Sequence, residues 1–132
     1  MVKNGLNVEV FPNDNADWHQ DKTLIPVVLN SFVEEIKEYL GDDLIKIILF
    51  GSVARNEVDP DDIDVCVVVK GYSGYDDERN DAIIDIAYQI DSDIGDYKTY
   101  LAPLICSETE YNASREPIYR NIKNDGDVLY AV

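Results

Sequence analysis

Two short and almost wholly apolar runs, Leu44–Phe50 and Ile63–Val69, constrain the fold of this chain more than any other feature. Neither run is long enough to span a membrane as a helix. A strand with one wet face alternates apolar and polar residues, whereas a continuous apolar run is typical of a strand that is covered on both faces. The two runs therefore predict two central strands of a sheet that has helices on both sides.

The segments around these runs predict helices. After Thr23, apolar residues recur at steps of three and four, which predicts an amphipathic helix that has Pro26 in its first turn and ends at Gly41. Its apolar stripe comprises Leu29, Phe32, Val33, Ile36 and Leu40. A second helix is predicted around Ile83, Ala87, Ile90 and Ile94, with Asp76 and Asp77 near its positive N-terminal end.

The rest of the chain completes an alternating order of strands and helices. Tyr100–Cys106 predicts a third strand, Ser114–Asn124 a short helix that ends at Gly126, and Val128–Val132 a last strand. This alternation favours a mixed α/β (α+β) fold in layers. At 132 residues the chain fits a single domain, which we expect over residues 23–132. Residues 1–22 are polar and predict an N-terminal arm, with one short strand at Leu6–Phe11.

Charge and composition narrow the classes of function. The chain has 27 acidic against 11 basic residues and a net charge of −16, which disfavours a free-standing nucleic-acid binder. A protein partner and a merely solvated acidic surface both remain open. No apolar signal region or membrane span is present, so we expect a cytoplasmic protein. Cys66 and Cys106 lie in apolar runs without metal-ligand spacing and are expected to be buried. His19 is expected to be a surface or packing residue.

Acidic residues stand at the mouth of the second apolar run. Asp62 and Asp64 are two residues apart, so on a strand their side chains point to the same face. Two carboxylates this close resist simultaneous ionisation, and a divalent cation removes that conflict. Mg²⁺ or Mn²⁺ is the expected metal, since hard cations take one or two carboxylates together with substrate phosphates.

A phosphate-binding turn is predicted where the first run ends. Gly51 and Ser52 follow that run and precede a helical turn, which presents backbone N–H groups and a hydroxyl to an anion. Arg55 lies about one helical turn further and offers a planar contact to phosphate. If the two strands are neighbours, the turn and the acidic pair converge on one nucleoside triphosphate and its metal.

The combination Phe50-Gly51-Ser52, nine residues, Asp62-Ile63-Asp64-Val65 resembles the minimal nucleotidyltransferase branch of the DNA polymerase beta-like nucleotidyltransferase superfamily. The resemblance extends over about residues 25–132 and implies a nucleotidyltransferase-like mixed sheet flanked by helices. It also implies that Asp62 and Asp64 are catalytic and bind metal, and that Gly51 and Ser52 hold the triphosphate of ATP or another nucleoside triphosphate. Pyrophosphate would leave as the nucleotidyl group is transferred.

The chain departs from this branch at three points. Asn56 stands where the branch usually has Gly, and the spacer is one residue shorter than is common. A third carboxylate normally follows on the next strand, where this chain has Tyr100. Asp96 is the nearest acidic residue upstream, and we expect it in the turn before the strand.

Three functions follow from the resemblance and the departures. The leading one is Mg²⁺-dependent AMP transfer from ATP, with the chain as the antitoxin that neutralises a HEPN-domain ribonuclease by binding it or by AMP transfer. The alternative is a catalytically degenerate module that binds nucleotide or a partner and lacks the third carboxylate. A small-molecule transferase of the aminoglycoside-modifying type ranks last, because the chain has no second domain to build an acceptor pocket. The acceptor, the base preference and the oligomeric state stay open.

Overall fold

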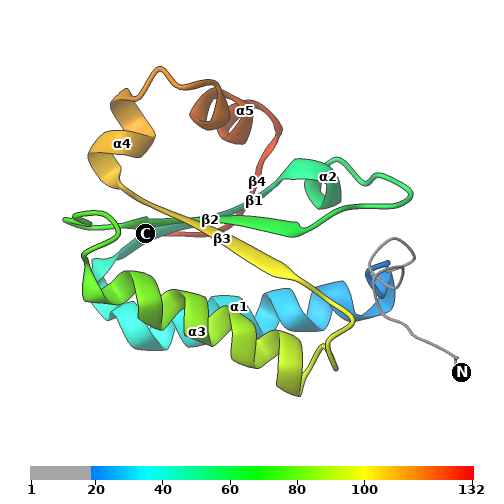
Figure 1. Ribbon diagram of the computed structural model, residues 1–132. Coiled ribbons are helices and arrows are strands. Elements are labelled where there is room, and N and C mark those ends of the chain that lie inside the picture. The colour runs from blue at the N-terminus through cyan, green and yellow to red at the C-terminus, as the bar shows by residue number, and fades with distance from the viewer. Residues whose placement is uncertain (1–18) are drawn as a thin grey trace, which may run out of the picture.

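The fold is a four-stranded sheet with helices on both faces, seen in a computed structural model that describes residues 19–132 (Figure 1). The strands are β1 (Leu44–Phe50), β2 (Ile63–Val69), β3 (Leu101–Ser107) and β4 (Asp127–Ala131). The helices are α1 (Ile25–Leu40), α2 (Gly51–Ala54), α3 (Glu78–Asp93), α4 (Glu108–Ala113) and α5 (Pro117–Asp125). Single 3₁₀ turns at Lys22–Leu24 and Gly41–Asp43 flank α1. The predicted mixed α/β fold is confirmed.

The two apolar runs form the centre of the sheet, whose strand order is β3-β2-β1-β4. β1 is antiparallel to β2 and to β4, whereas β2 and β3 are parallel. Along β2, Val65 and Val67 belong to the core under α1 and α3, and Cys66 and Val68 to the core under α5. Figure 1 shows α1 and α3 on one face and α4 and α5 on the other. Both faces of β2 are therefore covered, as its continuous apolar sequence predicts.

The first helix and the cysteines agree with the sequence interpretation in outline. α1 starts at Ile25 with Pro26 in its first turn, and Gly41 ends it at a φ of 54°. Its buried face is centred on Val28, whereas Leu29 of the predicted stripe is only half-buried. Cys66 and Cys106 are buried, free thiols, as predicted.

The helix predicted over Ser114–Asn124 is present as α5, which starts three residues later, at Pro117, and ends before Gly126 as predicted; α4, just before it, was not predicted. Ser107 caps α4 in a capping box with Glu110, and Ser114 ends α4 in an extended conformation. α5 then starts with Pro117 in its first turn. The Ser-x-x-Glu spacing is a helix-start signal that the sequence interpretation passed over.

The outer edge of β3 is largely closed to a further strand. The Leu101 N–H donates to Asp91 at 2.9 Å, the Ser107 N–H donates to Glu110 at 2.9 Å, and Pro103 has no N–H to donate. Capped and missing donors of this kind discourage edge-to-edge pairing. The strand predicted at Leu6–Phe11 lies outside the described residues. In residues 19–132, no helix is long and apolar enough to cross a bilayer.

Candidate active site

The turn between β1 and α2 brings Gly51 against Asp64. The backbone turns sharply at Gly51, which has a φ of +79°, a value that favours glycine. A Cβ at this position would overlap the Asp64 carboxylate oxygen Oδ2 and lie 3.1 Å from its Cγ atom. Phe50 pairs with Asp64 in the antiparallel register of β1 and β2. The turn at Gly51 and the acidic start of β2 at Asp64, which are separated along the sequence, therefore lie in contact.

The electrostatic environment of Asp64 is strongly negative. Partial burial, followed by the charges of Asp62 and Asp61, raises the pKa of Asp64 to about 6, while Arg55 opposes the rise. The influence of Asp62 on this pKa agrees with the two carboxylates facing the same way. A carboxylate in this setting binds either a proton or a cation.

Ser52 ties the acidic loop to the turn. The side chain is buried, and its Oγ atom accepts a hydrogen bond from the Asp61 N–H at 2.9 Å. The Glu57 N–H donates to the Ser52 carbonyl at 3.1 Å. Since the hydroxyl uses a lone pair in the bond to Asp61, its own proton remains to be donated.

Arg55 and Asn56 close the α2 turn. The Arg55 side chain is about half exposed and its Nε atom lies 2.9 Å from Glu57 in an exposed ion pair. Asn56 has a φ of 58°, in the left-handed region. Asn tolerates this conformation better than most residues, which explains how it replaces the glycine that is usual at this place in the branch.

Residues just before α1 support the acidic loop from outside. Gln20 is buried; its Nε2 atom donates to the Asp61 carbonyl and its Oε1 atom accepts from the Tyr100 N–H at 3.2 Å. Lys22 donates to the Val58 carbonyl at 3.1 Å. His19 is exposed, one of the two expected placements, with its Nδ1 atom 2.9 Å from Asp59. No pattern in the sequence indicates that these residues contact the loop.

No acidic residue of β3 adjoins the pair. The parallel register sets Ala102 beside Asp64, and the Ile63 N–H donates to the Tyr100 carbonyl at 2.8 Å, so Tyr100 lies beside the start of β2. Asp96 lies in the exposed turn before β3, 3.8 Å from Lys98.

Asp91 on α3 is another carboxylate near the first residues of β3. It accepts hydrogen bonds from the Leu101 N–H and the Thr99 hydroxyl, at 2.9 and 2.8 Å, which holds it at the first residues of β3. Among residues 19–132 no three acidic, His or Cys side chains group closely enough to hold a metal ion by themselves.

The donor set nevertheless fits a hard cation that is bound together with a substrate. Asp62 and Asp64 offer two carboxylates, and besides partial burial the charges of Asp62 and Asp61 contribute to the raised pKa of Asp64. Mg²⁺ is commonly held by one or two carboxylates plus phosphate oxygens and water. The two carboxylates thus supply the number of protein ligands that such a site commonly has.

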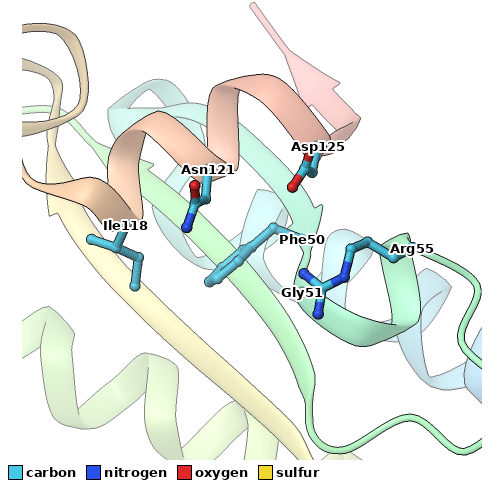
Figure 2. A pocket seen from close by; sticks show the side chains of 6 residues that line it. All are labelled: Phe50, Gly51, Arg55, Ile118, Asn121 and Asp125. Atoms are coloured by element: carbon cyan, nitrogen blue, oxygen red, sulfur yellow. The ribbon is translucent and has the colours of Figure 1, made fainter.

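A cavity of about 280 Å³ opens directly beside the Gly51 turn. Figure 2 shows α5 side chains on one side of it and the end of β1 on the other. It is lined by Phe50, Gly51, Arg55, Ile118, Asn121 and Asp125. The sequence interpretation missed the three α5 residues, although their i, i+3, i+7 spacing puts them on one helix face.

A second and larger cavity, of about 580 Å³, lies at the Asp62 end of the site between α3 and β3. Its rim includes Ile84, Tyr88 and Tyr100, whose exposed fractions are 45%, 60% and 55%. Exposed apolar and aromatic side chains gathered in this way are typical of surfaces that bind other molecules. Asp62 therefore belongs to the lining of this groove, and Asp64, two residues further on, contacts the Gly51 turn.

Comparison with known proteins gives relatives of two kinds. A protein of Methanocaldococcus jannaschii, whose name describes it as a protein adenylyltransferase, is 29% identical over 112 residues, which are 83% of this chain and 74% of the relative. A crystal structure of a mutant of the toxin–antitoxin pair MntA–HpeT has a TM-score of 0.49 and 17% identity, over 76% of this chain and 70% of that chain. A Sulfolobus solfataricus structure described as a nucleotidyltransferase has a TM-score of 0.44 and 18% identity, over 85% and 90%. A family model described as "Nucleotidyltransferase domain" matches residues 29–126.

Proposed function

Because this chain belongs to the nucleotidyltransferase domain family, we propose that it transfers AMP from ATP to a hydroxyl group of a protein acceptor. The observation that carries the proposal is the contact between Gly51 and Asp64. It supports the convergence of a phosphate-binding turn and a metal-binding pair on one triphosphate. The similarity to a protein named as a protein adenylyltransferase favours AMP as the group and a protein as the acceptor.

Each residue of the site has a distinct role in the proposed reaction. The backbone at Gly51, the Ser52 hydroxyl and the Arg55 guanidinium bind the triphosphate. Asp62 and Asp64 hold Mg²⁺ or Mn²⁺, which when bound offsets charge on the phosphates and lowers the pKa of the attacking hydroxyl. The acceptor hydroxyl releases its proton to solvent, and its oxygen forms a bond to the α-phosphorus. The bond from the α-phosphorus to the oxygen that bridges to the β-phosphorus breaks, and pyrophosphate leaves with that electron pair.

Asp64 must be ionised to bind the metal. Its pKa of about 6 lies below neutral pH, so the carboxylate is mostly charged in the cell and becomes protonated under mild acid. We therefore assign metal binding to the ionised form of Asp64.

The acceptor is proposed to approach from the groove beside Asp62. Its exposed Tyr88 and Tyr100 suit a protein surface, since tyrosine is enriched in interfaces. A net charge of −16 favours a partner with a basic surface. The structure of the MntA–HpeT pair has a TM-score below 0.5 to this chain and carries no argument about the partner. The proposed HEPN-domain ribonuclease partner therefore rests on the sequence motifs. The same holds for the proposed role as a cytoplasmic antitoxin.

A second function is favoured by one specific observation, the lack of an acidic residue on β3. A nucleotidyltransferase domain without its third carboxylate would bind nucleotide or partner and transfer nothing. In this reading Asp62, Asp64 and the Gly51 turn would retain metal-dependent nucleotide binding.

Two measurements separate these functions. Incubation with α-³²P-ATP, Mg²⁺ and the product of a neighbouring ribonuclease gene is expected to label that protein; nucleotide binding without label would favour the binding module. Calorimetry is expected to detect Mg²⁺-dependent ATP binding that Asp62→Asn with Asp64→Asn abolishes. The control Asp42→Asn with Asp85→Asn removes the same charge from exposed positions away from the site. Equal ATP binding by both double variants would refute the metal assignment.

A further inference from the structure

α5 has two faces, and folding explains only one of them. Tyr119 and Ile122 are buried in the core under the sheet. Ile118, Asn121 and Asp125 lie on a neighbouring face and line the cavity of about 280 Å³. Within helix residues Pro117–Asp125 this second face carries one apolar, one amide and one acidic side chain, all directed at the end of β1 (Figure 2).

The order of these side chains along α5 is informative. Asp125 lies above Gly51 and Arg55, Asn121 lies above Phe50, and Ile118 lies furthest from the turn (Figure 2). Seven residues of helix rise by about 10 Å, a length comparable with that of a nucleoside. A nucleotide whose triphosphate sits at Gly51 and Arg55 would therefore lay its ribose and then its base along this face.

We propose that the cavity is the nucleoside subsite, in which Asn121 recognises the base as adenine and Asp125 binds the ribose hydroxyls. The proposal rests on the proposed function, because it takes the triphosphate to lie at the Gly51 turn. It assigns the base preference to Asn121 and the sugar preference to Asp125, two α5 residues that no motif of the sequence singles out.

The chemistry of a side-chain amide suits adenine. The oxygen of Asn121 accepts from the exocyclic N6 amine while its nitrogen donates to N7, a pairing well known for Asn and adenine. Guanine presents acceptors at both O6 and N7, so it leaves the amide oxygen without a donor. Phe50 and Ile118, which are partly exposed in the cavity, offer apolar surface to the two faces of the ring.

Asp125 suits a neutral polar group with donors. A carboxylate accepts hydrogen bonds from vicinal ribose hydroxyls, as acidic residues do in dinucleotide sites. The proposed subsite therefore orients the nucleotide as well as selecting its base.

Calorimetric titration of the full chain with Mg²⁺ and the α,β-methylene analogues of ATP, GTP and 2′-deoxy-ATP tests the subsite. The unmodified protein is expected to bind the ATP analogue about tenfold more tightly than the GTP analogue. Asn121→Ala is expected to remove most of this preference, and Asp125→Ala the preference for ribose over 2′-deoxyribose. Asn124→Ala, on the same helix but outside the cavity lining, is the matched control and should keep both preferences.

The outcomes distinguish this inference from the function on which it rests. Metal-dependent binding of both triphosphates with equal affinity, or an unchanged preference in Asn121→Ala, would overturn the subsite and leave the proposed function intact. Absence of any nucleotide binding to a folded protein would overturn both. Loss of selectivity in Asn121→Ala, with metal-dependent binding retained, supports the assignment, because a mere packing role would lower all affinities alike.

Discussion

Gly51 and Asp64 are in such close contact that no side chain fits between them: a Cβ on Gly51 would overlap the Asp64 carboxylate. Gly51 directly follows the last residue of β1, and Asp64 lies near the start of β2, the neighbouring antiparallel strand. Because the carboxylate stands directly on the glycine backbone, a change in either residue affects the other. Four predictions follow from this relationship and from the groups around it.

Gly51→Ala is expected to lower the free energy of unfolding by about 2 kcal/mol, through backbone strain at positive φ and displacement of Asp64. ATP binding should be lost with it. Chemical denaturation and calorimetry measure the two effects.

Gly71→Ala is the matched control for this substitution. Gly71 has a φ of +66° with no atom within 4 Å of an added Cβ, so it reports the strain without the overlap. Equal destabilisation by the two substitutions would mean that the overlap with Asp64 carries no energetic weight.

Asp64→Asn is expected to stabilise the metal-free protein at pH 8 and abolish nucleotidyl transfer. The folded pKa of Asp64, about 6, lies above the usual aspartate value. The protonated form is therefore favoured by folding; this stabilisation is complete below about pH 4 and is lost as the pH rises through 6. Since the group is partly solvated, we expect a gain of about 1 kcal/mol for Asp64→Asn at pH 8.

The pH dependence of the difference checks the sign. Unfolding free energies of the unmodified protein and of Asp64→Asn should converge near pH 4, and Mg²⁺ with ATP should stabilise only the former. Asp42→Asn should show no such convergence, since Asp42 is exposed away from the site. A difference that stays constant between pH 4 and 8 would contradict the raised pKa.

A carboxylate introduced on β3 is expected to increase transfer. Tyr100 lies beside the start of β2 and Ala102 beside Asp64, so Tyr100→Asp and Ala102→Asp sample the two positions that adjoin the acidic pair. Magnesium sites in proteins are commonly built from carboxylate and phosphate oxygens, and Tyr100 and Ala102 offer no carboxylate. Rates of AMP transfer under saturating Mg²⁺ identify which position restores the third ligand.

Both substitutions can be compared with Tyr100→Asn and Ala102→Asn, which have nearly the same shape without the charge. Strong transfer by the unmodified protein that is insensitive to Tyr100 would show that no third carboxylate is needed there. Asp96→Asn would then be the next variant to measure.

Gln20→Ala is expected to weaken ATP binding, although Gln20 itself is not assigned a contact with the substrate. Its loss leaves the Asp61 carbonyl and the Tyr100 N–H without their side-chain partner, at about 1–3 kcal/mol. Gln20→Glu keeps the acceptor for Tyr100 and loses the donor to Asp61, so it isolates the acidic loop.

Gln89→Ala, an exposed change on α3, is the control for Gln20→Ala. A positioning role predicts a raised KM for ATP with a smaller change in kcat. If Gln20→Glu binds ATP as well as the unmodified protein, the bond to Asp61 has no part in positioning the loop.

The local sequence determined the central strands and the mixed α/β class. The apolar runs of β1 and β2 are continuous because both faces of each strand are covered. Burial on both faces can therefore be recognised from the sequence alone. The glycine at residue 51 and the two-residue spacing of Asp62 and Asp64 are equally local, so the motif that suggests a site could be recognised; their roles stay predictions.

Only the tertiary structure decided which distant groups complete the site. Gln20 reaches Asp61, Ala102 stands beside Asp64, and Asn121 lies over Phe50, because strand register and helix packing bring together residues from 20 to 121. No periodicity or residue spacing in the sequence indicates any of these contacts, because each joins residues that are far apart along the chain.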